Sequence, residues 1–187
     1  MLGFLLNFFR PKWKHSNPKA REKAIKMLGA TGKKNVTKIL LDALGDSHES
    51  VRTAATESLS QMGSRILDPL IQSLNSQDPS IRKATVIALG ATDDSRVIKP
   101  LINVLEDDDP NVRKTVVETL SRIGTSQVID PIIHILADNE SYVRKAASDA
   151  LRILAAKVGD MDVKKLALSY DRDMKKMLAK LVRSGDP

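Results

Sequence analysis

The sequence reads Asp78-Pro79-Ser80-Ile81-Arg82-Lys83-Ala84 and, 31 residues further on, Asp109-Pro110-Asn111-Val112-Arg113-Lys114-Thr115. The arginine of this stretch recurs at intervals of 30 or 31 residues, at Arg21, Arg52, Arg82, Arg113 and Arg144. A leucine follows each arginine after seven residues, at Leu28, Leu59, Leu89, Leu120 and Leu151. A fixed period of about 30 residues is typical of stacked helical repeats, in which each unit buries its apolar face against its neighbours.

Each period predicts two helices. Between Ser64 and Gly90, apolar residues recur at helical spacing in two runs that are separated by a polar turn. We expect Ser64 to cap the first helix, Asp78 to cap the second with Pro79 at its first position, and Gly90 to end it. A proline inside a helix costs about 3 kcal/mol, so the prolines of the first helices should lie in the first turn or at a kink. They are Pro69, Pro100 and Pro131.

This helix–turn–helix pattern, with Asp-Pro-x-Val-Arg-x-x-Ala at its second helix, resembles the HEAT repeat. It is most similar to the short HEAT-like repeats of the phycobilisome-lyase type, over about residues 15–156. The resemblance implies an all-α, right-handed α-solenoid of about five helical hairpins. We expect one domain over residues 1–187, with an apolar N-terminal cap at 1–14 and one or two basic capping helices at 157–187. A repeat fold of this kind hosts many activities, so the resemblance does not identify the function.

We predict a non-catalytic scaffold or adaptor that binds another protein through a groove lined by the second helices. The residue after each repeating arginine, and the residue four positions later, should project away from the core. The candidate groove residues are Thr53, Glu57, Lys83, Ile87, Lys114, Glu118, Lys145 and Asp149. Ile87 is the apolar exception, and we place it nearest a hot spot. The pairs Lys114–Glu118 and Lys145–Asp149 also fit ordinary ion pairs within a helix.

The five repeating arginines are interpreted as a structural ladder. In HEAT-like repeats such an arginine resembles an internal bridge from its guanidinium to a carboxylate or carbonyl of an adjacent turn. The planar fork of arginine suits this role because it binds carboxylates through two hydrogen bonds. A ligand-binding role for the arginines is the alternative.

Catalysis and cofactors are not predicted. The chain has no cysteine, and its three histidines show no metal-ligand spacing. HEAT-like deoxyhypusine hydroxylases place His-Glu after the Val-Arg of their repeats to hold iron, whereas Thr53-Ala54 and Lys83-Ala84 stand there in this chain. A lyase-type or chaperone-like accessory factor remains an alternative. The lack of cysteine is compatible with a reducing compartment, and we expect the cytoplasm.

Positive charge is concentrated at the two ends. Residues 1–38 carry a net charge of +9, residues 39–151 carry −6, and residues 152–187 carry +4. This distribution argues against nucleic acid as the ligand of the central repeats, since phosphate binding needs clustered Lys and Arg. An anionic surface bound by the basic ends is the alternative function. Polar capping units, which repeat arrays need at their ends, explain the same charges.

The most apolar segment is residues 1–9, which Arg10-Pro11-Lys12-Trp13-Lys14 follows. Its charges lie after the apolar run, which argues against a secretory signal. We favour a cap on the first hairpin, in which Trp13 covers apolar residues. A membrane-interface anchor made by residues 1–14 is the alternative. No stretch approaches the roughly 20 apolar residues that would cross a bilayer.

Overall fold

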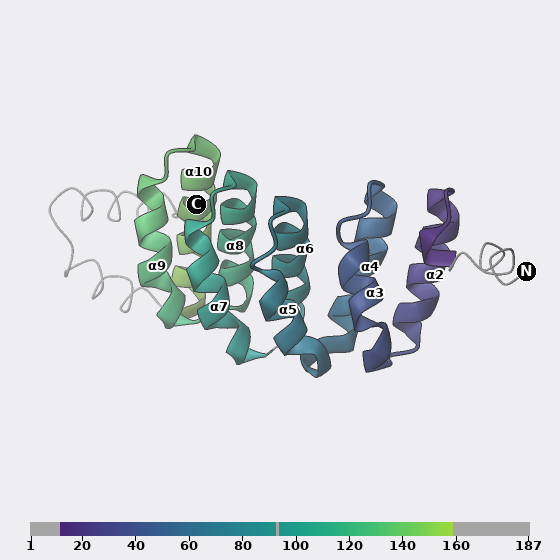
Figure 1. Cartoon of the computed structure of the whole chain (residues 1–187). Coiled ribbons are helices and arrows are strands. Elements are labelled where there is room, and N and C mark those ends of the chain that lie inside the picture. Colours follow the sequence, from purple (N-terminus) through teal and green to yellow (C-terminus); the bar gives the residue numbers. More distant parts are fainter. Residues whose placement is uncertain (1–11, 93, 159–187) are drawn as a thin grey trace, which may run out of the picture. The chain divides into compact units, whose positions relative to one another are not determined.

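The computed structural model describes residues 12–92 and 94–158, and within these residues every regular element is helical (Figure 1). The chain divides into two compact units, residues 1–97 and 98–187. Both units are built from hairpins of a short first helix and a longer second helix. The prediction of an all-α fold made of helical hairpins is confirmed for these residues.

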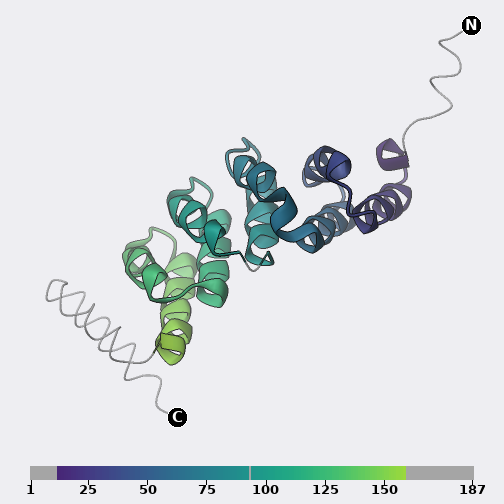
Figure 2. The same ribbon diagram turned by 90° about the horizontal axis from the view of Figure 1, so that it is seen from below.

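The first unit holds three second helices and the two short first helices between them. In Figure 2, α2 and α4 lie side by side, and they pack against each other. The α elements are α2 (Pro18–Ala30), α3 (Thr37–Ala43), α4 (Glu49–Met62), α5 (Leu67–Ser73) and α6 (Pro79–Gly90). The 3-10 turns are η1 (Lys12–Lys14), η2 (Lys34–Val36), η3 (Gly63–Ile66) and η4 (Ser95–Val97).

The second unit holds two hairpins, whose second helices pack against each other. Its α elements are α7 (Ile98–Asn103), α8 (Pro110–Ile123), α9 (Ile129–His134) and α10 (Ser141–Val158). Its 3-10 turns are η5 (Val104–Glu106), η6 (Ser126–Val128) and η7 (Ile135–Ala137). The α-helical part of each first helix is therefore short, because 3-10 turns take up the residues before it and, in the second unit, also those after it.

The three prolines of the first helices stand at the third residue of α5, α7 and α9. At this position the backbone nitrogen has no helical carbonyl to bond, so proline does not break the helix. The prediction of a first-turn position is confirmed. Ser64 was wrongly predicted as the cap of the first helix: it lies within η3, and Ile66 stands at the N-cap of α5. The physical reason is the intervening 3-10 turn, which delays the start of the α-helix.

Side-chain caps begin three of the second helices. The side chains of Asn17, Asp78 and Asp109 accept hydrogen bonds from the backbone nitrogen two residues later, at 2.9, 2.8 and 2.8 Å. A proline follows each of them as the first helical residue. The capping prediction for Asp78 and Pro79 is therefore confirmed, and the same residues explain Asp109.

Gly90 does not end α6 as a left-handed cap, contrary to the prediction. It is the last helical residue and is buried, and the C-cap is Ala91 with φ −97°. Gly29 holds the corresponding place after the repeating leucine, and a Cβ atom there would overlap with the side chain of Ser58 on α4. Gly29 thus allows the close approach of α2 and α4. Positive φ angles occur instead at Gly32 (61°) and at Gly63 (58°), and Gly63 is the C-cap of α4.

The core lies between first and second helices. The repeating leucines Leu59, Leu89 and Leu120 have no exposed surface. First-helix residues fill the opposite side, and among them Leu40, Leu70, Leu101 and Ile132 are equally inaccessible. Leu28, in the first hairpin, is only partly buried. The strict spacing of the leucines therefore reflects one repeated packing position.

Truncation of a repeating leucine should be costly. We expect Leu89→Ala to lower the free energy of unfolding by about 2–5 kcal/mol, because the cavity forms at a fully buried position. Met27→Ala is the control, since Met27 is 59% exposed and its truncation should change the free energy by less than about 0.5 kcal/mol. Urea unfolding followed by circular dichroism measures both, and equal losses would contradict the assigned packing.

Candidate functional site

The turn between the two helices of each hairpin has one recurring architecture. A side chain in this turn accepts a hydrogen bond from the backbone nitrogen two residues later, which fixes the turn before the second helix begins. The acceptors are Asp46 (2.9 Å from His48 N), Ser76 (3.2 Å from Asp78 N), Asp107 (2.8 Å from Asp109 N) and Asp138 (2.9 Å from Glu140 N). Three of these four equivalent positions hold aspartate, and the fourth holds serine.

Each repeating arginine reaches back to this turn from the first turn of its own second helix. The Nη1 atom donates to the backbone carbonyl six residues earlier in all five repeats. The bonds are Arg21 to His15 (2.8 Å), Arg52 to Asp46 (2.8 Å), Arg82 to Ser76 (2.8 Å), Arg113 to Asp107 (2.8 Å) and Arg144 to Asp138 (2.7 Å). The arginine therefore stabilises its own turn through a charge-assisted hydrogen bond.

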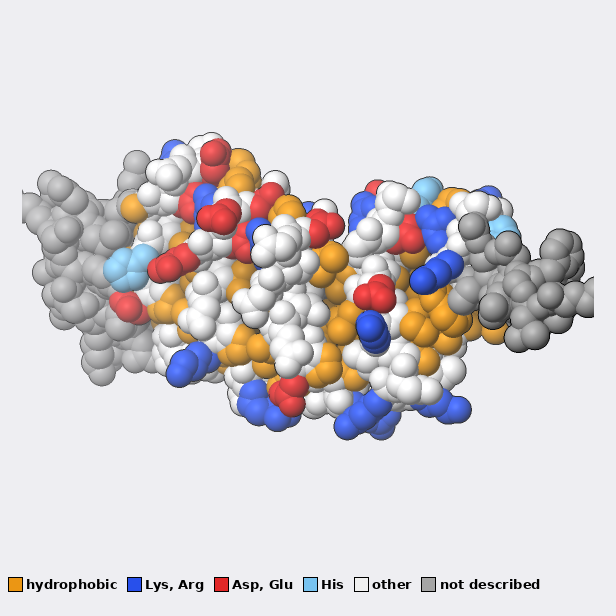
Figure 3. Space-filling model, viewed as in Figure 1, with side chains coloured by type: hydrophobic (Ala, Val, Ile, Leu, Met, Phe, Trp, Pro, Cys, Tyr) orange, Lys and Arg blue, Asp and Glu red, His pale blue; other side chains and the backbone are white. Residues whose placement is uncertain are grey.

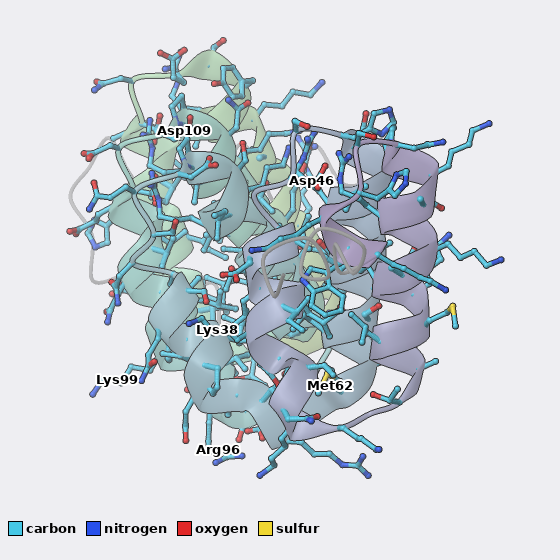
Figure 4. The ribbon with its side chains drawn as sticks, turned by 45° about the vertical axis from the view of Figure 1, so that its right-hand side comes forward. Lys38, Asp46, Met62, Arg96, Lys99 and Asp109 are labelled. Carbon is cyan, nitrogen blue, oxygen red and sulfur yellow. The ribbon has the colours of Figure 1, made fainter. Side chains whose placement is uncertain are left out.

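Two of the arginines also bind the turn aspartate of the next hairpin. Arg21 donates to Asp46 from Nε and Nη2, at 2.8 and 2.7 Å. Arg113 donates to Asp138 in the same way, at 2.7 and 2.9 Å. Figure 4 shows Asp46 at one end of its hairpin, opposite the end that holds Met62. Both aspartates thus link two arginines, one through the carboxylate and one through the backbone carbonyl.

The electrostatics follow from these bonds. The hydrogen bonds from Arg113 hold the pKa of Asp138 below its usual range, and those from Arg21 do the same for the pKa of Asp46. The Arg113 and Asp138 side chains are only 15% and 6% exposed. A pair this shielded from water leaves an unpaired charge behind when one partner is removed.

The series is interrupted at Arg52. Ser76 stands where the other turns carry aspartate, and its hydroxyl makes the turn hydrogen bond but supplies no negative charge. Among the described residues, the Nε and Nη2 atoms of Arg52 have no hydrogen-bond or ion-pair partner. One edge of the Arg52 guanidinium, the edge that binds carboxylate in Arg21 and Arg113, is therefore open.

A groove of about 370 Å³ lies between α4 and α6, and Arg52 is one of its lining residues. Its lining residues are Glu49, Arg52, Thr53, Thr56, Glu57, Ser80, Lys83, Ala84 and Ile87. In Figure 3, which looks onto the first helices, the upper outline of the surface is notched between the positions that α6 and α4 have in Figure 1. Ile87 lines this groove and leaves 40% of its surface exposed, so it offers apolar surface there.

The structure brings together four of the eight candidate groove residues. Thr53 and Glu57 on α4 face Lys83 and Ile87 on α6 across the same groove. Sequence reasoning had placed Arg52 in the ladder and had missed Glu49, Thr56, Ser80 and Ala84. The available signal was the interval between Arg52 and Arg82, which is 30 residues where its neighbours are 31, together with serine at position 76.

The other four candidates lie on α8 and α10 of the second unit. Lys114 and Glu118 form an ion pair at 3.2 Å, as one turn of helix allows. Asp149 pairs with Arg152 at 3.2 Å and not with Lys145, contrary to the predicted alternative. The i,i+3 geometry competes successfully with the i,i+4 geometry here, since arginine reaches the carboxylate from the next turn.

The ends of the chain are only partly described. Trp13 is partly buried in η1, which packs against α2. Residues 1–11 and 159–187 lie outside the described residues, and with them most of the predicted N-terminal cap and C-terminal helices. Lys157, at the end of α10, donates to the backbone carbonyls of Ser121 and Arg122 at 2.9 and 2.6 Å. This lysine therefore caps the end of α8.

Within residues 12–92 and 94–158, no helix is both long and apolar enough to span a membrane. In the same part of the chain, no group of three or more His, Asp or Glu side chains is arranged to hold a metal ion.

The fold and the repeated turn define a helical repeat protein, and comparison with known families agrees. The model of the HEAT repeats matches residues 6–66 and 67–152, so the chain belongs to the HEAT-repeat family. No curated protein matches the sequence significantly.

Solved structures share the fold at low sequence identity. The complex of CpcE and CpcF of phycocyanin lyase from Nostoc sp. is 22% identical, with a TM-score of 0.54, over 89% of this chain and 71% of that chain. A structure of microtubule plus end tracking by XMAP215, CLIP-170 and EB1 is 15% identical, with a TM-score of 0.66, over 95% and 90%. The MAST/Orbit N-terminal domain is 19% identical, with a TM-score of 0.60, over 92% of both chains. The resemblance to HEAT repeats is thereby confirmed, and the phycocyanin lyase complex shares the fold.

Removal of the arginine from a complete ladder pair should destabilise the protein. We expect Arg113→Ala to lower the free energy of unfolding by about 1–3 kcal/mol, because it leaves the Asp138 carboxylate without its partner. Arg144→Ala should cost less, since Arg144 is exposed and, among the described residues, its side chain bonds only to backbone carbonyls. If urea unfolding shows Arg113→Ala to be as stable as the wild type, the arginine has another purpose.

The same pair predicts a pH dependence. The folded-state pKa of Asp138 is lowered, so its contribution is present above the unfolded pKa of about 3.9 and is lost as the pH falls through the folded value. The stability advantage of the wild type over Asp138→Asn should therefore be constant above about pH 5 and shrink below pH 4. Thermal melts at a series of pH values measure it, and a gap that widens on acidification would contradict the assignment.

Proposed function

We propose that this chain is a non-catalytic protein-interaction module whose partner occupies the groove between α4 and α6. The observation that carries the proposal is the exposed Ile87 beside charged and hydroxyl side chains in one concave surface. An apolar anchor with polar groups around it is the usual composition of a protein-binding hot spot. HEAT-repeat proteins form extended surfaces of this kind by stacking their second helices.

The structural neighbours support a protein partner in general terms. One of them is a complex of two chains, CpcE and CpcF, and another concerns tracking of microtubule ends by three proteins. Identities of 22% and 15% support the fold alone, so neither partner is carried over to this chain. A lyase-type accessory role rests only on the first of these likenesses. The residues 1–11 that a membrane anchor would use, and most of the basic C-terminal segment, are not described.

The groove proposal predicts that two substitutions on α6 reduce partner binding. Ile87→Asp removes the apolar anchor, and Lys83→Glu reverses the adjacent charge, whereas neither side chain is part of the buried core. Hot-spot substitutions typically cost about 2 kcal/mol or more of binding free energy. We expect both variants to lose proteins that the wild type captures from native lysate, at unchanged melting temperature.

Lys99→Glu provides the matched control, since Lys99 is an exposed lysine on the first helix α7 (Figure 4). It should capture the same proteins as the wild type. Lys114→Glu, on α8 of the second unit, tests separately whether the remaining candidate residues contribute to capture, and reduced capture is expected there too. Equal capture by Ile87→Asp, Lys83→Glu and the wild type, measured by quantitative mass spectrometry, would refute the groove.

A further inference from the structure

The open edge of Arg52 is a defined chemical site. In Arg21 and Arg113 the same two nitrogen atoms, Nε and Nη2, each donate to one oxygen of an aspartate at 2.7–2.9 Å. In Arg52 the third nitrogen, Nη1, is fixed to the carbonyl of Asp46, so the orientation of the guanidinium is set by the protein. The position that a carboxylate occupies in the other pairs is left vacant because residue 76 is serine.

From this arrangement we infer that Arg52 binds a carboxylate of the partner protein, an Asp or Glu side chain that takes the place of the missing ladder aspartate. The inference rests on the proposed function, and it adds the chemistry of the partner. Arg52 and Ile87 line the same groove, so a chain that contacts Ile87 lies next to the Arg52 side chain. The partner's acidic side chain would therefore form the same arginine–carboxylate pair that joins two hairpins elsewhere in this chain, but the pair would join two proteins.

The surrounding residues restrict the partner further. Lys83 lines the groove and forms no ion pair among the described residues, so it adds a second positive charge to the site. Glu49 and Glu57 line the groove as well, so its two positive and two negative side chains balance, and an acid gains most where it pairs directly with Arg52. Ala84 and Ile87 offer apolar surface. The partner segment should thus carry a single acidic residue next to an apolar one, and not a run of acids.

The geometry and the charges of the open site favour a carboxylate over a phosphate group as its ligand. The Arg21 and Arg113 pairs have the planar two-bond geometry that matches a carboxylate, and Arg52 presents the corresponding edge. Two glutamates in the lining would oppose the larger negative charge of a phosphate group. Repulsion by these glutamates therefore favours an acid that carries one charge.

Substitution of Ser76 gives a sharp test. Ser76→Asp should place a carboxylate of this chain on the open edge of Arg52, as Asp46 does for Arg21, and should exclude the partner's acid. Ser76→Asn is the matched control, because it has nearly the same shape without the charge. Arg52→Lys keeps the positive charge but lacks the two-nitrogen edge. Circular dichroism checks that all three variants fold.

The probe is the blocked peptide Ac-Ala-Asp-Leu-NH2, with Ac-Ala-Asn-Leu-NH2 as its uncharged control, titrated into the full ¹⁵N-labelled chain. We expect the Arg52 Nε resonance, assigned by its absence from Arg52→Lys, to shift with the Asp peptide and not with the Asn peptide. Affinity should fall by about tenfold or more in Arg52→Lys and Ser76→Asp, because a charge-assisted pair is lost, and it should persist in Ser76→Asn.

Three results would overturn the inference: an Arg52 Nε resonance that the Asp peptide does not move, equal binding of the two peptides, or undiminished binding to Arg52→Lys. An unchanged Arg52 Nε resonance in free Ser76→Asp would mean that the new carboxylate does not reach Arg52. Peptide binding to Arg52→Lys then decides whether the inference holds. The inference and the proposed function fail separately. Partner capture that is lost in Ile87→Asp but retained in Arg52→Lys would uphold the groove and refute the carboxylate.

Discussion

The hydrogen bond from each repeating arginine to the turn six residues before it is the constraint on which this structure depends. It ties the second helix of every hairpin to the loop that precedes it, at 2.7–2.8 Å in all five repeats. Where the turn carries aspartate, as at Asp46 and Asp138, the same loop is also held by the arginine of the preceding hairpin. A single residue type thus connects local helix geometry with the packing of neighbouring repeats.

Much of the fold could be predicted because it follows from periodicity. The leucine spacing marks a buried position, and Asp78-Pro79 and Asp109-Pro110 mark helix starts through capping chemistry that acts within three residues. The errors concern features that local sequence does not determine. Gly90 resembles a helix stop, but glycine serves equally well where two helices approach closely, as Gly29 does against Ser58. Ser64 failed as a cap because the chain makes a 3-10 turn first.

The candidate site was predictable in part and for a similar reason. Helical geometry alone places Thr53, Glu57, Lys83 and Ile87 on the outward face of their helices, and the structure gathers them around one groove. Geometry within one helix could not show whether neighbouring helices leave space between them. It also could not show that Asp149 selects Arg152 over Lys145, since both lie within reach along the helix.

The interruption at Ser76 unites the structural and functional interpretations of the arginines, which sequence reasoning treated as alternatives. A ladder arginine is oriented by the carbonyl it binds, so loss of its carboxylate leaves a positive group that is already positioned, and less conformational entropy is lost when a new acid binds. An arginine on a mobile surface side chain has no such advantage. Serine at position 76 therefore leaves Arg52 without a ladder carboxylate in the same groove that Ile87 lines, and the fixed guanidinium supplies a specific polar group there.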